Sequence, residues 1–305
     1  MHRYIFRRIG QAILSLFLLS IIIFAVVRLT GDPLTLLLND QATDEDRAKL
    51  REALGLDKPW PVQYWIFASN FLTGDFGNSI RGGTPVEDLV ASRVFASLKL
   101  AGAAILFVLA IAIPLGIITA VKKGTPVDTS GRFIAVFAQS APSFWVGIIL
   151  IQIFSVNLGL LPTSGTGGID HYVLPAFTLS LFVIAGVMRL LRSSMLEVLD
   201  AEYIKLARIK GVPEWKVVIK HSLRNALIPV VTFGGTYVAT FVTFGILAEV
   251  VFAWPGLGRL LFEGIVFRDF PVIQALVLLA GALVITANLV VDILYAYIDP
   301  RIRYQ

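Results

Sequence analysis

Six long apolar runs without charged residues constrain this 305-residue chain more than any other feature. Each run approaches or exceeds the roughly 20 helical residues needed to cross a bilayer. The composition agrees, since 56% of residues are hydrophobic and only 15% are charged, unlike a soluble domain. The sequence therefore predicts an all-α integral membrane protein with six transmembrane helices. The runs are Ile9 to Val27, Leu100 to Val121, Phe133 to Leu161, Val173 to Met188, Ala226 to Ala248 and Pro271 to Val291.

Two of the runs depart from a simple span. The third is too long for one straight helix, so we expect a kink near Pro142 or an end before Leu160. The fourth is short, and Arg189 and Arg192 at its end are expected to extend toward the lipid headgroups. Asp292, at the end of the last run, is expected to pair with one of these two arginines.

Basic residues set the predicted orientation. Most lysines and arginines lie in residues 1–8, 122–132, 189–225 and 299–305, which places both termini in the cytoplasm. The expected domains are residues 1–29 (cytoplasmic N-terminus and first span), 30–97 (external helical insertion) and 98–305 (five-helix core with cytoplasmic loop 189–225). A cleaved secretory signal is disfavoured because no small-x-small cleavage site follows the first run.

The external insertion is predicted to be helical. One helix is expected between Thr43 and Gly55, an aromatic-rich second one from Trp60, and a third start at Thr84, where a proline and an acid follow an N-cap residue. The aromatic residues of this second helix are Trp60, Tyr64, Trp65, Phe67 and Phe71. They either contact a docked protein or peptide, or form a membrane-interface belt, which is the simpler interpretation.

One long basic segment separates the fourth and fifth runs. It contains a predicted helix from Glu202 to Lys210, then Gly211 and Pro213, the latter suited to the first turn of a new helix, and then an amphipathic run to Pro229. Glycine permits the positive φ of a tight bend between helices. Two short helices joined by a bend either dock into a cytoplasmic partner or lie on anionic lipid.

This segment resembles the EAA loop of ABC importer permeases, the element that docks into the cytoplasmic ATPase. It reads YIKLARIKG from Tyr203 and HSLRNALIP from His221, which is similar to the peptide-importer branch. It departs from the general motif by Lys205 in place of a glutamate and Arg224 in place of a proline. The residues that the resemblance assigns to the ATPase-coupling loop are Glu202, Lys205, Ala207, Lys210, Gly211, Glu214, Trp215, His221, Arg224 and Asn225.

Other segments carry the resemblance along the chain. Residues Gly55 to Trp65 and Gly74 to Ile80 resemble the external domain of peptide permeases, and EVVFAWPGLG from Glu249 resembles the family's signature outside the fifth span. Within that second block, four residues form either an external gate or, equally, a rigid turn. The four residues are Glu249, Trp254, Pro255 and Gly256.

The resemblance implies a type I ABC importer permease fold in a bacterial inner membrane. It implies a subunit that forms half of a pathway for di- or oligopeptides, with glutathione as one candidate. The implied partners are a second homologous permease, two cytoplasmic ATPase subunits and an external substrate-binding protein. ATP and magnesium would bind to the ATPases and no cofactor to this chain. The alternative cargo is nickel or another small solute, and the alternative class is a non-ABC carrier or membrane scaffold.

The sequence lacks the motifs of several enzyme classes. The chain has no HExxH, GxSxG or GxxxxGK[ST] sequence, so we expect no catalytic residue, no metal site and no ATP bound through a phosphate loop. With no cysteine, thiolate chemistry is excluded. A secondary carrier would show related halves with paired broken helices, which this sequence lacks. Nucleic acid is not an expected partner.

Overall fold

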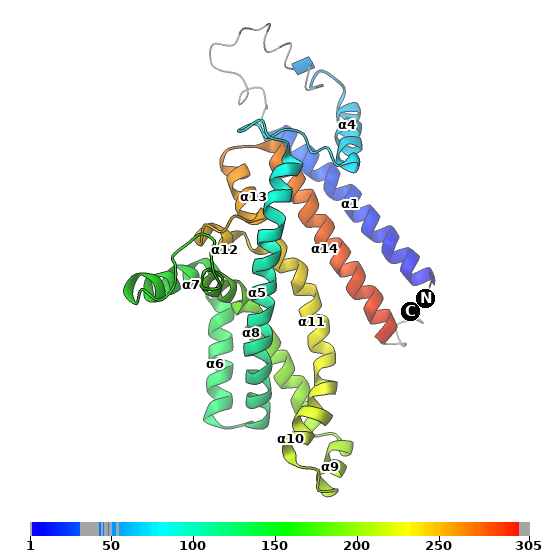
Figure 1. Ribbon diagram of the computed structural model, residues 1–305. Coiled ribbons are helices and arrows are strands. Elements are labelled where there is room, and N and C mark those ends of the chain that lie inside the picture. Colours follow the sequence, from blue (N-terminus) through cyan, green and yellow to red (C-terminus); the bar gives the residue numbers. More distant parts are fainter. Residues whose placement is uncertain are drawn as a thin grey trace. The chain divides into compact units, whose positions relative to one another are not determined.

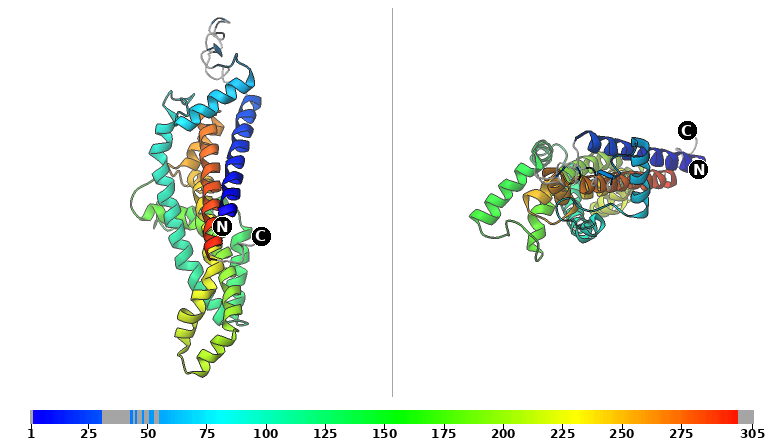
Figure 2. Two further views of the ribbon diagram at one scale, coloured as in Figure 1. Left: turned by 90° about the vertical axis from the view of Figure 1, so that its right-hand side faces the viewer. Right: turned by 90° about the horizontal axis from the view of Figure 1, so that it is seen from above.

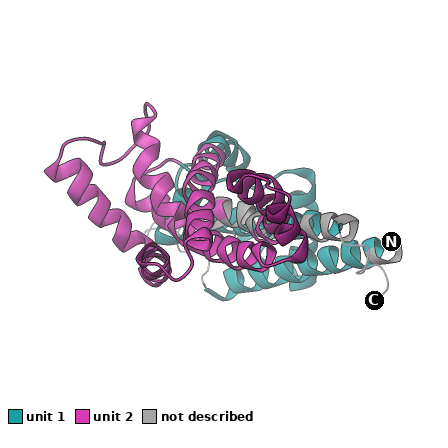
Figure 3. Ribbon diagram, turned by 90° about the horizontal axis from the view of Figure 1, so that it is seen from below, with its two compact units in different colours: residues 1–96, 256–305 teal, residues 97–255 magenta. Residues whose placement is uncertain are grey.

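The computed structural model describes residues 2–30, 43, 45, 48, 51–52 and 55–298. Within these ranges the regular structure is helical, apart from one isolated bridge between Asn78 and Pro85. The helix predicted between Thr43 and Gly55 falls mostly outside the described residues. Contacts divide the chain into two units, one of residues 1–96 with 256–305 and one of residues 97–255 (Figure 3).

The first unit is built on two long apolar helices. Helix α1 (His2–Thr30) lies along α14 (Phe270–Ile298), and the two helices run side by side (Figure 1). Gly281 lets them approach, because a Cβ added there would collide with Leu19. Buried side chains of Ile23, Val27 and Leu278 form the seam between them, which is the close apolar packing that holds helices together in membranes.

Two short helices of this unit pack against the long pair. Helix α4 (Trp60–Thr73) confirms the predicted aromatic helix, and its Tyr64 hydroxyl lies 2.8 Å from the Ser20 hydroxyl of α1. Tyr64 also meets Phe24 edge-on, with 5.6 Å between ring centroids. Helix α13 (Leu257–Val266) packs against α14. Trp60 and Trp65 remain exposed, so the choice between a lipid belt and a docked partner stays open to test.

Helix α5 (Val86–Val121) begins where Thr84 and Pro85 predicted a helix start. It does not end within the insertion but continues without a break through residue 97, where we placed the edge of the external segment. The apolar second run and the third external helix are thus one helix of 36 residues. The expected domain boundaries concern the position of the bilayer, and they stay a prediction.

The second unit packs around helix α8 (Asp170–Leu199), whose buried positions recur along nearly its whole length. It contacts α6 (Pro126–Ser140), α7 (Ser143–Leu150) and α11 (Leu223–Phe244). The predicted kink at Pro142 is confirmed, since α6 and the stretch from α7 through the π-helix η1 (Ile151–Asn157) meet at an angle of 106°. Pro142 cannot continue a helix because it lacks an N–H and restrains the preceding residue.

A buried carboxylate joins α6 to α8. Asp128 is only 1% exposed and accepts two hydrogen bonds from Arg192, from Nε at 2.7 Å and from Nη2 at 2.9 Å. From the sequence we expected Arg192 to extend toward the lipid headgroups. Its guanidinium instead binds Asp128. The side chain of its other expected partner, Asp292, lies outside the described part of the chain. Asp128 also accepts a hydrogen bond from the Gly124 amide and forms an ion pair with Arg132. These partners offset the cost of burying its charge.

Four described helices are long and apolar enough to cross a membrane, and the bent pair at Pro142 makes a fifth candidate. The four are Ile5–Thr30, Val86–Val121, Asp170–Leu199 and Phe270–Val290. The remaining predicted span, residues 226–248, coincides with α11 and the start of α12 (Ile246–Val251). Many side chains of α11 lie outside the described part of the chain, and the count of six stays a prediction.

Candidate functional site

The predicted bend at Gly211 is a complete helix-ending motif. Helix α9 (Glu202–Ile209) ends at Lys210, and Gly211 follows with φ of +76°. The Gly211 amide donates to the Arg208 carbonyl at 2.9 Å, and the Val212 amide donates to the Ala207 carbonyl at 3.1 Å. These two bonds are the pair of a Schellman motif. Backbone hydrogen bonds within residues 207–212 therefore close the bend.

An ion pair spans this bend. Arg208 donates to both carboxylate oxygens of Glu214, at 2.7 and 3.1 Å, and so ties α9 to the start of α10 (Glu214–Lys216). The hydrogen bond from Arg208 lowers the pKa of the Glu214 carboxyl. Within α9, the hydrogen bond to Glu202 raises the pKa of Lys205. Pro213 precedes α10 as its N-cap residue rather than standing in its first turn, because its ψ of 141° is extended.

The two arms of the bend are anchored by buried apolar side chains. Ile204 of α9 and Val217 of the π-helix η2 (Val217–Ser222) are both fully buried, and α9 packs against η2 and α8. Asn225 donates to the Tyr203 hydroxyl at 2.8 Å and so ties α11 to α9. A π-helical turn is uncommon and is often found at functional sites. The loop is thus a firm extension of α8 and α11.

Large apolar side chains of this loop are exposed on both sides of the bend in the sequence. Ile209 is 81% exposed and Trp215 is 65% exposed, and Leu206 and Ile219 are also exposed. Figures 1 and 2 show α9 and α10 at one end of the second unit, beyond the end of α6. Large apolar side chains grouped on an exposed face mark an interaction surface. We call this group, Leu206, Ile209, Trp215 and Ile219, the apolar knuckle.

The remaining predicted loop residues flank the knuckle. Lys210 and Arg224 are exposed, and His221 is half-buried in η2. Lys216 places its ammonium 5.4 Å from the centroid of the Trp215 ring. The predicted loop residues lie on α9, the bend, α10, η2 and the start of α11. Sequence reasoning missed Arg208 and Tyr203, although the opposite charges of Arg208 and Glu214 on either side of a glycine were a usable signal.

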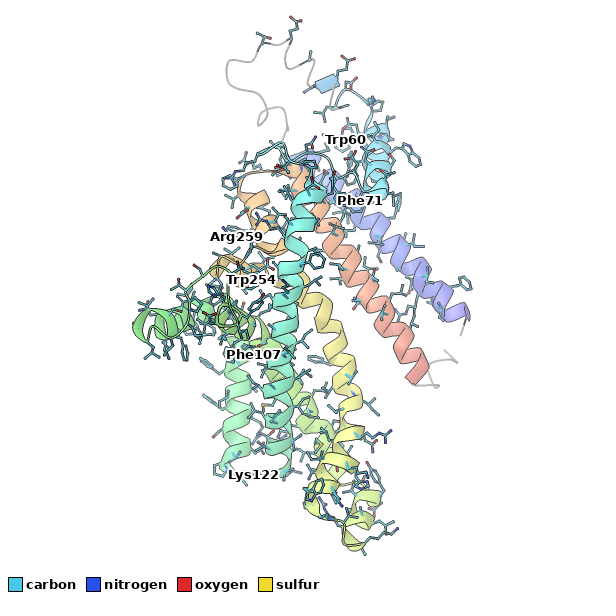
Figure 4. All side chains as sticks on the ribbon, in the orientation of Figure 1. Trp60, Phe71, Phe107, Lys122, Trp254 and Arg259 are labelled. Atoms are coloured by element: carbon cyan, nitrogen blue, oxygen red, sulfur yellow. The ribbon has the colours of Figure 1, made fainter. Side chains whose placement is uncertain are left out.

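Two of the four residues of the predicted external turn are joined through the backbone, since the Trp254 amide donates to the Glu249 carbonyl at 2.8 Å. Glu249 is 1% exposed, and the Ser97 hydroxyl donates to its Oε1 at 2.6 Å. The Trp254 ring, labelled in Figure 4, is also buried and meets the Tyr172 ring edge-on, with 4.7 Å between the ring centroids. Pro255 closes the second unit, and Gly256 belongs to the first, as the N-cap residue of α13.

The geometry of these residues favours the rigid-turn interpretation. Glu249 has a hydroxyl partner and Trp254 a packed ring, while Ala253 takes a left-handed φ of 49° that is uncommon outside glycine. A hydrogen-bonded carboxylate and a packed indole are held in place. Sequence reasoning missed Ser97, because a single serine at the start of an apolar run carries no local signal.

Comparison with known proteins identifies the family of this chain. Residues 112–304 match the family described as the binding-protein-dependent transport system inner membrane component. Residues 1–101 match the N-terminal family of the same transport-system membrane component. The chain belongs to this family. It is a permease subunit of the ABC importer class, and the described helices fit the all-α fold of such permeases.

Individual relatives cover the whole chain. The chain is 40% identical over 316 residues to the oligopeptide transport system permease protein AppB of Bacillus subtilis, with 100% of both chains covered. It is 43% identical over 306 residues to the glutathione transport system permease protein GsiC of Escherichia coli strain K12, and 42% identical to GsiC of Salmonella typhimurium, again with 100% of both chains covered. These relatives place the chain in the peptide and glutathione branch of the permeases.

Proposed function

We propose that this chain forms half of an import pathway for di- or oligopeptides, with glutathione as one candidate cargo, in a bacterial inner membrane. A second homologous permease forms the other half, two cytoplasmic ATPase subunits bind and hydrolyse ATP with magnesium, and an external binding protein delivers the cargo. The cargo rests on the names of relatives that are 40–43% identical over their whole length. The partners rest on membership of a binding-protein-dependent transport family.

The apolar knuckle carries the mechanistic proposal. Leu206, Ile209 and Trp215 project from a bend that is fixed by its own backbone bonds and by the Arg208–Glu214 ion pair. A short helical element with apolar anchors fits a groove in a partner protein. When ATP closes the two ATPases, the grooves move and carry the knuckles with them. The loop thereby converts closure of the ATPases into movement of the helices that line the pathway.

Packing within the second unit supports transmission from the loop. Burial of Ile204 and Val217 joins the bend to α8 and α11, and Asp128 with Arg192 joins α8 to α6. Interiors packed in this way move as rigid bodies rather than deform. Movement of the knuckle therefore moves α6, α8 and α11 together, which is what alternating access requires.

The decisive experiment substitutes the bend. Gly211→Val places a β-branched residue at a φ of +76°, which costs about 1–3 kcal/mol of backbone strain. A Cβ at this position would meet no atom within 4 Å, so the cost is conformational and not steric. We expect the variant to insert normally, to lose cargo transport and to copurify less ATPase. Gly211→Asn is the matched control, since asparagine tolerates the left-handed region, and it should retain most transport.

Charge reversal separates docking from lipid binding. A helix pair that lies on anionic lipid loses affinity by about 1 kcal/mol per basic residue wherever the charge is removed. Docking depends instead on position, so Lys205→Glu, Lys210→Glu and Lys220→Glu should differ from one another in transport and ATPase copurification. If Gly211→Val transports cargo as well as the parent does, this loop does not couple the ATPases to transport.

Cysteine labelling tests the proposed orientation. The chain has no cysteine, so single cysteines report without background. Lys58 and Lys210 are both exposed, and cysteines placed there should react with an impermeant reagent from opposite sides of the membrane. Ser79, although also in the external segment, is buried and would report poorly. Reaction of both positions from the same side would overturn the orientation with both termini inside.

A further inference from the structure

Two sequence blocks that are far apart meet in the first unit. The Ser79 hydroxyl and the Ile80 amide both donate to the carboxylate of Asp269, across 190 and 189 residues of sequence. Asp269 is 4% exposed. The turn that contains Ser79 is also closed by its own bonds, from the Ser79 amide to the Thr84 carbonyl at 2.9 Å and from the Gly83 amide to the Ser79 carbonyl at 2.8 Å. The backbone of residues 78–85 is therefore held in one conformation.

This turn presents an arginine beside an aromatic ring. The Arg81 guanidinium carbon lies 3.8 Å from the centroid of the Phe267 ring, in a cation–π contact that fixes its plane. Among the residues that the structure describes, no acid forms an ion pair with Arg81. Arg93 borders the same cavity, and its Nη2 lies 3.8 Å from Glu263 Oε2. Glu263 receives a closer bond from Arg259 at 2.9 Å, so Arg93 is only loosely engaged. Figure 4 labels Arg259 on α13.

The cavity between these residues has a volume of about 270 Å³. Leu89, Leu260 and Val272 line it beside the two arginines. The carboxylates of Asp269 and Glu263 also line it, but Asp269 is engaged by the turn and Glu263 by Arg259. This volume lies below the roughly 300–1,000 Å³ of pockets that enclose a small-molecule ligand, so a whole oligopeptide does not fit. It accommodates one side chain inserted by a docking protein. A planar guanidinium held on a ring matches a carboxylate with two hydrogen bonds.

We propose that this cavity, which we call the Arg81 pocket, receives an aspartate or glutamate side chain of the external substrate-binding protein when that protein docks. The proposal rests on the proposed function, which supplies the partner, and on the orientation that places residues 30–97 outside. Arg81 supplies the main contact and Arg93 the second charge. The bonds of Asp269 to the turn hold Arg81 in place before docking, so little conformational entropy is lost on binding.

The test uses the complete importer in lipid nanodiscs with its binding protein. Stimulation of ATPase activity is measured against binding-protein concentration, and direct binding is measured in parallel. Arg81→Glu should weaken the apparent affinity by about tenfold or more, because it places like charges together at a desolvated contact. Copurification of the complete complex checks that the variant assembles. Reversal of one acidic residue on the binding protein to lysine should restore affinity for Arg81→Glu and weaken affinity for the parent.

Lys58→Glu is the matched control, since Lys58 is an exposed basic residue of the same unit outside the pocket. It should change affinity by roughly twofold or less. Three results overturn the proposal: unchanged affinity with Arg81→Glu, an equal loss with Lys58→Glu, or Arg81-dependent binding of free dipeptide to the importer without its binding protein. The proposed function fails separately, if no peptide-loaded binding protein stimulates the parent complex at all.

Discussion

The turn at residues 78–85 and the bend at Gly211 both reverse the chain between helices, but they are stabilised by different means. The bend is closed by backbone bonds within residues 207–212 and by Arg208 and Glu214, six residues apart. The turn depends in addition on Asp269, which lies about 190 residues away. The bend is a local structure that exposes apolar side chains, whereas the turn is a tertiary structure that positions an arginine.

The turn and the bend should respond differently to substitution. A local bend can be strained without disturbing distant helices, because its bonds close within one short segment. A turn held by a distant carboxylate transmits any change to the element that supplies it. Damage at Gly211 should therefore stay within the loop, whereas damage at Asp269 should appear in two regions of the sequence.

Asp269→Ala should have the largest effect. It removes the acceptor of two hydrogen bonds to a charged group, each worth about 1.5–3 kcal/mol, so we expect a loss of about 3 kcal/mol or more in the stability of this region. Hydrogen exchange should rise both in residues 79–83 and around residues 264–270. Asp75→Ala is the control, since exposed Asp75 accepts a hydrogen bond from the nearby Gly77 amide and should change exchange only there. Faster exchange confined to residues 79–83 would show that the two regions are independent.

Gly211→Ala should have an intermediate effect. Alanine at a positive φ costs about 1 kcal/mol, and the open space around the position adds no collision. Exchange should rise in residues 202–222 and nowhere else, with a modest decrease in transport compared with Gly211→Val. Changes in α6 or the distant part of α8 would contradict the local character of the bend.

Glu214→Gln should have the smallest effect. The Arg208 and Glu214 side chains are 41% and 56% exposed, and exposed pairs contribute about 0–1 kcal/mol after screening. Because the folded-state pKa of Glu214 is lowered from 4.5, the pair contributes fully above the unfolded-state pKa and is lost as the pH falls through the lowered value. Exchange in residues 207–216 should distinguish parent from variant at pH 7, and the difference should shrink as the pH falls through the lowered pKa of Glu214. A difference that stays constant as the pH falls would assign the effect to packing.

Prediction from the sequence succeeded where the signal was local. The kink at Pro142, the helix that begins at Trp60, the helix start at Val86 and the bend at Gly211 each follow from residues next to them in the chain. Apolar composition was likewise enough to indicate membrane helices. The hydrogen bonds from Arg192 to Asp128 were not predicted, because Asp128 lies 64 residues away and no pattern in the sequence relates the two positions.

By itself, the sequence determined the membrane as solvent, the helical class, the positions of the breaks and the family. Hydrophobic length, proline and glycine act within a few residues and do not need the rest of the fold. Only the tertiary structure decided which charges are buried together. It joined Ser79 to Asp269 and Ser97 to Glu249, because a buried carboxylate is tolerated only where hydrogen-bond donors converge on it, and those donors come from whichever helices the fold brings alongside.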